Sequence, residues 1–111
     1  MKTYKTGDKV IFRKWPVGCE IIALFPQIAA SVDGHLCESY MHVGQHSSAN
    51  PAVIVRDTTP ATPKEFIKLK RELRQIGYNP VVVKRFRYKD FQIRKAQYQE
   101  KGEQDANEKR L

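Results

Sequence analysis

Residues 62–77, TPKEFIKLKRELRQIG, carry the clearest structural signal in the chain and decide its fold class. Thr62 is a typical N-cap residue, Pro63 suits the first helical position, and Glu65 completes a Thr-x-x-Glu capping box. Gly77 suits the left-handed residue that ends many helices. Between these signals, apolar side chains recur at helical spacing and form one stripe: Phe66, Leu69, Leu73 and Ile76. The stretch therefore predicts an amphipathic helix that packs on one apolar face.

The segments around this helix have the composition of strands and loops. Runs rich in β-branched and aromatic residues predict strands at 10–15, 20–25, 35–43, 52–57 and 81–86. Residues 26–34 and 44–51 have the composition of connections. The run IIALF is apolar throughout, which predicts a central strand covered on both faces. The order β-β-β-β-α-β predicts an α+β fold, in which a mainly antiparallel sheet of four to five strands is packed by one amphipathic helix.

A chain of 111 residues fits one domain. We expect a single α+β domain over residues 1–90, followed at 91–111 by a charged, basic C-terminal helix or tail. No apolar run approaches the roughly 20 residues that cross a membrane, and the start of the chain lacks the apolar core of a secretory signal. We therefore expect a cytoplasmic protein in which Cys19 and Cys37 are reduced thiols.

The positive charge of the chain, +8 in total, is concentrated in its second half. Up to Pro60 there are six basic and five acidic residues, a net charge of +1, whereas the remainder has fourteen basic and seven acidic residues, a net charge of +7. Such a field favours polyanions: nucleic acid, an acidic face of another protein, or an anionic membrane surface. Of these we expect nucleic acid or an acidic protein and no membrane. The alternative is that the charge serves solubility alone.

Two basic segments are the candidates for polyanion binding. The predicted helix exposes Lys68, Arg71 and Arg74. If the last strand continues past residue 86, arginine and lysine alternate with aromatic rings that can stack on bases. This second group consists of Lys84, Arg85, Phe86, Arg87 and Tyr88. The alternative for these residues is an edge strand kept soluble by its charge.

The stretch HLCESYMHVGQH, residues 35–46, contains all three histidines of the chain. As a strand it would place His42 on the opposite face from His35 and Cys37, and its spacing matches no zinc motif, so we expect no metal. We expect Cys37 to be a half-buried core thiol, and a pair of His42 with Glu38 to be hydrogen-bonded without being catalytic. The segment is instead a candidate contact surface, comprising Glu38, Tyr40, His42, Gln45 and His46.

The strings EIIALFP, SYMHVGQHS and TTPATPKEF, with VVVKR beyond them, resemble a set of small bacterial proteins from genomes and mobile elements. The shared feature is an SYxHVGQH-like core, and the resemblance covers roughly residues 10–86. It carries over no activity and no catalytic residue. It implies a bacterial, intracellular accessory protein, of a kind that sometimes binds and blocks larger machines such as defence complexes.

Three functions follow as hypotheses. The first is a small non-enzymatic binding protein, without cofactor, that contacts nucleic acid or a nucleoprotein through its basic C-terminal half. The second is a protein-interaction or inhibitor module, of accessory or anti-defence type, that uses residues 38–46. The third is a small enzyme or metal protein based on His42, His46 and Glu38, with Cys37 as an optional further member. No catalytic signature supports the third.

Overall fold

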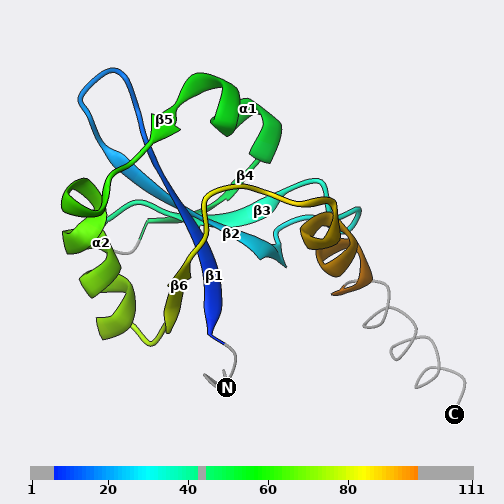
Figure 1. Cartoon of the computed structure of the whole chain (residues 1–111). Helices are drawn as coiled ribbons and strands as arrows, with labels where there is room; N and C mark the ends of the chain where they lie inside the picture. The colour runs from blue at the N-terminus through cyan, green and yellow to red at the C-terminus, as the bar shows by residue number, and fades with distance from the viewer. Residues whose placement is uncertain (1–6, 43–44, 98–111) are drawn as a thin grey trace, which may run out of the picture.

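The computed structural model describes residues 7–42 and 45–97, which form one sheet with helices on both of its faces (Figure 1). The strands are β1 Asp8–Lys14, β2 Ile21–Ala29, β3 Cys37–Tyr40, β4 His46–Ala49, β5 Thr59–Pro60 and β6 Pro80–Val82. The helices are α1 Pro51–Asp57, α2 Pro63–Gln75 and a C-terminal helix at residues 88–97. The predicted α+β class, with a mainly antiparallel sheet packed by an amphipathic helix, is confirmed.

Strand β1 organises the sheet, because three other strands pair with it. The order is β4-β3-β2-β1-β5, and β6 also pairs with β1. Strands β2 and β5 run antiparallel to β1, with Ile11 opposite Leu24 in the first pairing. Strand β6 runs parallel to β1 and places Asp8 opposite Pro80. Segments far apart in the sequence therefore share one edge of the sheet.

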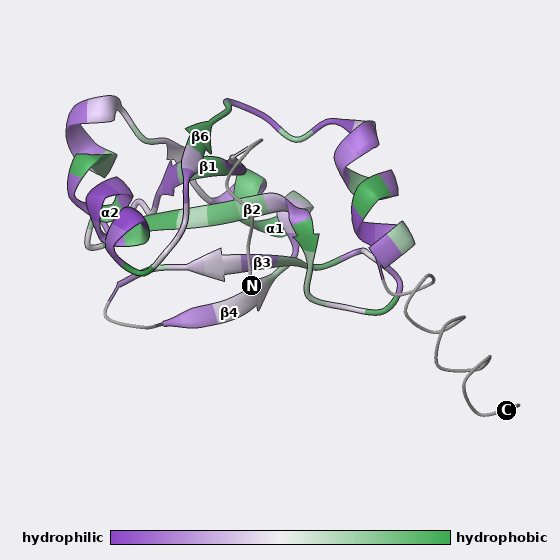
Figure 2. Cartoon of the chain, turned by 90° about the horizontal axis from the view of Figure 1, so that it is seen from below, coloured by the Kyte–Doolittle hydropathy of each residue, from purple (hydrophilic) through white to green (hydrophobic). Residues whose placement is uncertain are grey.

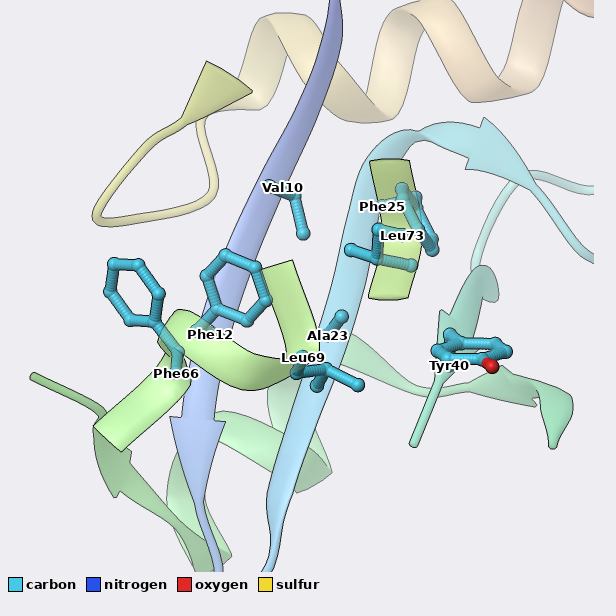
Figure 3. Packing of buried hydrophobic residues seen from close by; sticks show 8 residues of the cluster. All are labelled: Val10, Phe12, Ala23, Phe25, Tyr40, Phe66, Leu69 and Leu73. Carbon is cyan, nitrogen blue, oxygen red and sulfur yellow. The ribbon is translucent and has the colours of Figure 1, made fainter. Parts of the chain in front are cut away.

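Both faces of the sheet are covered, as the apolar run in β2 predicted. Side chains of α2 close the core on one face (Figure 3), where the buried residues are Val10, Phe12, Ala23, Phe25, Tyr40, Phe66, Leu69 and Leu73. The opposite face has its own cluster: Ile11, Ile22, Leu24, Cys37 and Ala49. Ile54 of α1 packs against this second cluster, together with Val83 and Phe86. Accordingly, β2 is largely hydrophobic in Figure 2, whereas the edge strand β4 is not.

Helix α2 forms as its sequence predicts. The Thr62 hydroxyl accepts the Glu65 amide and the Glu65 carboxylate accepts the Thr62 amide, so both halves of the capping box are present. Gly77 has a φ of +115°, the left-handed conformation expected beyond the helix end. Ile76 departs from the predicted stripe, because it is the C-cap residue and 48% exposed.

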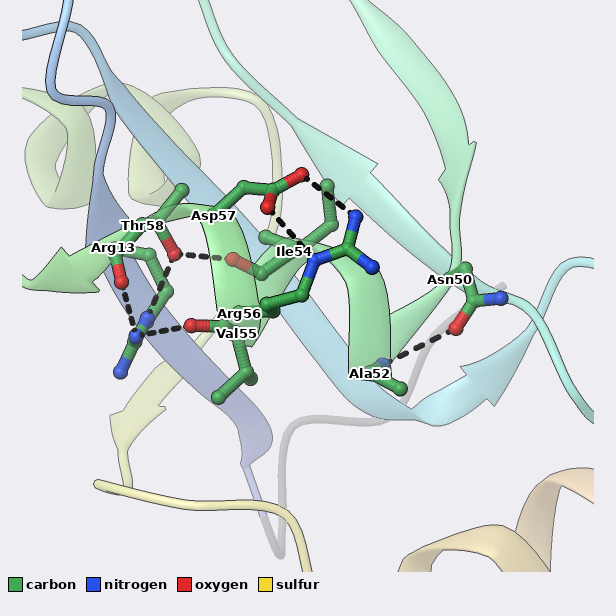
Figure 4. A network of polar contacts seen from close by, with 8 residues as sticks. All are labelled: Arg13, Asn50, Ala52, Ile54, Val55, Arg56, Asp57 and Thr58. Atoms are coloured by element: carbon green, nitrogen blue, oxygen red, sulfur yellow. Dashed lines mark hydrogen bonds and ion pairs between the residues drawn. The ribbon is translucent and has the colours of Figure 1, made fainter.

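The prediction of a strand at 52–57 is wrong, since these residues lie in helix α1. Asn50 caps that helix by accepting the Ala52 amide, and Pro51 occupies its first turn (Figure 4). At the other end, the buried Arg13 of β1 donates to the carbonyl oxygens of Val55 and Thr58. Satisfied helix ends thus outweigh the β-propensity of the valine and isoleucine side chains.

Further boundaries differ from the sequence prediction. Of the described residues in the strand predicted at 35–43, only Cys37–Tyr40 form strand β3. Strand β2 continues past Pro26, because a register irregularity between Phe25 and Ala29 accommodates the missing amide of proline. Residues 46–49, predicted as loop, form β4, which pairs antiparallel with β3 and places His46 opposite Tyr40. Residue 44, the first of the connection predicted at 44–51, lies outside the described residues.

The predicted strand at 81–86 ends early, at Val82, and residues 84–88 do not alternate along an extended strand. Instead a helix covers residues 88–97. The buried Asp90 accounts for its start, because its carboxylate accepts the Arg87 amide in the manner of a capping residue and also accepts the Gln27 side chain. No helix within residues 7–42 and 45–97 is both long and apolar enough to cross a membrane. Residues 98–111, most of the predicted tail, lie outside the described residues.

Candidate functional site

Helix α2 directs both of its carboxylates toward the sheet. Glu65 pairs with Lys14 of β1, with 2.5 Å between the Lys14 Nζ and a carboxylate oxygen. The Lys14 bond lowers the pKa of Glu65 to about 2, with the Thr62 amide as the next contribution. Glu72 accepts the hydroxyl of Tyr40 and lies 2.6 Å from Nδ1 of His42. Both acidic groups of α2 are thus occupied by the protein itself.

The cationic side chains of α2 have no such partners. None of them forms an ion pair with another described residue, and all but Lys70 are exposed: Lys64, Lys68, Lys70, Arg71 and Arg74. Three of these, Lys68, Arg71 and Arg74, are the polyanion-binding residues predicted from the sequence. Lys68 lines one pocket together with Glu65 and Glu72, and the remaining cations leave positive charge on the rest of the solvent face of α2.

The second basic group lies on the other side of the sheet. Val83 and Phe86 pack against the cluster opposite α2, so the chain from 83 to 89 is separated from α2 by the sheet. Its exposed cations are Lys84, Arg85, Arg87 and Lys89. The structure therefore does not merge the two predicted basic groups into one continuous helix-and-strand surface.

The two aromatic residues predicted to stack on bases have different surroundings. Phe86 is half-buried against the core, and the guanidinium of Arg94 lies 5.9 Å from its ring centroid. Tyr88 is 73% exposed. Of this pair, Tyr88 is the ring that is open to a ligand.

Two of the three histidines, His42 and His46, lie in one cluster around Tyr40 and Glu72, whereas His35 lies elsewhere, beside Phe91. His42 contacts Glu72 rather than the predicted Glu38. His46 lies over the ring of Tyr40, with 4.7 Å between ring centroids, and its Nε2 is 3.2 Å from the hydroxyl of Tyr78. Within the described part of the chain, no three histidine, cysteine or carboxylate side chains are grouped as metal ligands.

The predicted contact surface over 38–46 is only partly exposed. Tyr40 is 1% exposed and Glu38 is half-buried, whereas His42, Gln45 and His46 lie at the surface. Beside them a pocket of about 460 Å³ opens between α2, the β1–β2 hairpin and the end of β3. Its lining combines an apolar floor with charged walls: Glu20, Ile21, Met41, His42, Gln45, Glu65, Lys68, Leu69 and Glu72.

Cys37 is a core residue. It is fully buried, more so than predicted, and burial raises the pKa of its thiol to about 11. The thiolate, which is the nucleophilic form, is therefore scarce at neutral pH. Cys19 lies exposed in the loop between β1 and β2.

Sequence reasoning missed the role of the C-terminal helix. Arg94 is 4% exposed and binds two main-chain carbonyl oxygens, although an arginine in a charged segment is ordinarily assigned to the surface. The available signal was spacing, since Asp90, Arg94 and Gln97 recur at helical intervals and all three bind residues of β2 or the loop that follows it.

No protein-family model, curated protein or solved structure matches the chain. The resemblance to small bacterial and mobile-element proteins therefore stays a prediction.

Proposed function

We propose that this protein is a non-enzymatic nucleic-acid-binding protein that uses the solvent face of α2 as a phosphate-binding surface. The observation that carries the proposal is the division of charge on α2. Glu65 and Glu72 are engaged on the sheet side, while the cations of the solvent face have no ion-pair partner among the described residues. Lysine and arginine side chains without ion-pair partners can neutralise phosphates and release the counterions condensed on the nucleic acid.

The arrangement favours nucleic acid over a role in solubility alone. A surface that only keeps a protein soluble usually intersperses both signs of charge, whereas the solvent face of α2 carries one sign. The cations of α2 run from Lys64 to Arg74, about 15 Å along the helix axis, a length that spans several phosphates of a nucleic-acid backbone. In line with the resemblance, we propose a cytoplasmic accessory protein whose target is nucleic acid or a nucleoprotein.

The test is a salt-dependent titration of fluorescent single- and double-stranded DNA and RNA. We expect Kd to rise steeply with salt, with a log–log slope of about 0.7–0.9 per phosphate contacted. Arg71→Gln removes one unpaired cation from α2 and should lower that slope by about one contact. Arg56→Gln is the matched control, because it removes one charge from a residue that is exposed on α1 and paired with Asp57.

Two results would contradict the proposal. One is the absence of binding at low salt. The other is an equal loss of affinity in the Arg71 and Arg56 variants, which would mean that net charge alone decides the interaction.

The pocket beside His42 supports a second candidate, a protein-interaction module. It adjoins the exposed part of the 38–46 segment, and its apolar floor with charged walls can accept a side chain of a partner protein. A photo-crosslinker in place of Gln45 should then capture one defined protein, and the purified chain should not bind bare nucleic acid. A placement of the crosslinker at Val53, an exposed residue of α1 on the opposite face of the sheet, is the control.

A further inference from the structure

A buried arginine fixes the C-terminal helix to the loop between β2 and β3. Arg94 donates from Nε to the carbonyl oxygen of Gly34 at 2.8 Å and from Nη1 to that of Pro26 at 2.6 Å. The loop and the helix touch closely, because a Cβ on Gly34 would lie 2.7 Å from the amide nitrogen of Lys95. The helix at 88–97 is thus held beside the end of β2 (Figure 1).

The loop itself is ordered by a short polar network. The Asp33 carboxylate accepts the hydroxyl of Ser31 at 2.7 Å and the amide of His35 at 3.0 Å. The same Ser31 oxygen accepts the Leu36 amide at 3.0 Å. The bond from the His35 amide, followed by that from the Ser31 hydroxyl, lowers the pKa of Asp33. The network fixes the position of His35 relative to the helix.

The result is a row of three rings on the surface. The rings of His35 and Phe91 have centroids 5.2 Å apart, and those of Phe91 and Tyr88 are 6.0 Å apart. Tyr88 and His35 are exposed and Phe91 is half-buried. Beside the row lies a hollow of about 560 Å³, lined also by the exposed Val32 and by Lys95.

Three cationic residues lie next to this row in the sequence or in the hollow. Arg87 and Lys89 flank Tyr88 in the sequence, and Lys95 lines the hollow; all three are exposed and have no ion-pair partner among the described residues. The lining also holds the carboxylate of Asp33, which accepts two bonds within the loop and keeps its negative charge, so the phosphates are expected on the Arg87, Lys89 and Lys95 side of the row. Exposed rings among unpaired cations are the combination that binds single strands, because every base has a face that can stack and every nucleotide a phosphate.

We propose that the ring row of Tyr88, Phe91 and His35 is a stacking platform for single-stranded nucleic acid, with Arg87, Lys89 and Lys95 on its phosphates. The proposal rests on the proposed nucleic-acid function and adds a second surface to it, of a different kind from α2. Single strands are favoured because the bases of a duplex stack on each other and leave no face for a protein ring.

The experiment compares a fluorescent single-stranded oligonucleotide, as DNA and as RNA, with a duplex of the same sequence. Tyr88→Leu removes the ring at an exposed position and leaves the charge unchanged. We expect it to weaken single-strand binding about 5- to 100-fold, with the salt slope unchanged. Tyr88→Phe keeps the ring and should bind as the unaltered protein does. His35→Ala provides a second test in a different element and should also weaken single-strand binding.

The outcomes separate the two proposals. Loss of affinity in Tyr88→Leu at constant salt slope, with Tyr88→Phe unaffected, supports the platform. Single-strand affinity that is equal in the unaltered, Tyr88→Leu and His35→Ala proteins overturns it and leaves the α2 surface intact. If the protein binds the duplex but not the single strand, the platform is likewise overturned and the α2 surface is retained. Binding of neither form removes the proposed function and the platform together.

Discussion

The buried Arg94 gives the most direct test of the structure. Arg94→Met keeps a long side chain but removes both bonds to the buried carbonyl oxygens of Pro26 and Gly34. Each bond to a charged donor contributes about 1.5–3 kcal/mol, and relief from burying a charge offsets part of the loss. We therefore expect the free energy of unfolding, measured by urea titration, to fall by about 2–4 kcal/mol. Amide hydrogen exchange in residues 88–97 should become faster.

The control is Lys95→Met on the same helix. Lys95 is exposed, so its replacement should change stability by less than about 0.5 kcal/mol. Suppose that Arg94→Met has the same free energy of unfolding as the control and that the amides of residues 88–97 exchange at the rate of the unaltered protein. The helix at 88–97 is then not held against the loop between β2 and β3 by Arg94. In that case the ring row would also lose its support.

Three other tests examine separate parts of the fold. Gly34→Ala should destabilise more than Gly18→Ala in urea unfolding: both residues have positive φ, near +77° and +79°, but only at Gly34 does a Cβ meet backbone. Glu65 has a folded-state pKa of about 2 against an ordinary 4.5, so its bond with the lysine of β1 stabilises above pH 4.5 and is lost as the pH falls toward 2. Glu65→Gln should flatten the stability profile in that window. A thiol reagent at pH 8 should modify Cys19 at once and Cys37 only when the protein unfolds. Rapid reaction of both thiols in the folded protein would contradict the burial of Cys37.

Local signals predicted the parts of the fold that depend on local contacts. Helix α2 was predicted with its cap and its C-terminal glycine because the Thr62–Glu65 box and the apolar stripe lie within one segment. The central position of β2 followed from a run with no polar residue. These features need no knowledge of distant segments.

The errors occurred where a distant residue decides the local conformation. Helix α1 was taken for a strand because its valines and isoleucine favour β structure, while its last carbonyl oxygens are bound by Arg13, more than 40 residues away. The strand at 81–86 was predicted too long for a related reason, since the start of the C-terminal helix depends on the buried Asp90 and its contact with Gln27.

The same limit applies to the candidate site. The sequence predicted the cations of α2 and the exposed Tyr88, because lysine, arginine and polar flanks indicate a surface. It could not predict that Glu65 and Glu72 turn toward the sheet, or that His35 joins Phe91, since both depend on contacts between separate elements.

The pairing of β1 with β6 also constrains how the chain folds. Asp8 and Pro80 are roughly 70 residues apart, so this pair closes a long loop, whereas β1 to β4 form a meander of neighbouring strands. During synthesis the meander can assemble well before β6 exists. Until then, the start of β1 has an unpaired edge, a state that invites pairing with other chains. The rate of folding should therefore depend on the closure of this parallel pair, and the time spent without it sets the exposure of the nascent chain to aggregation.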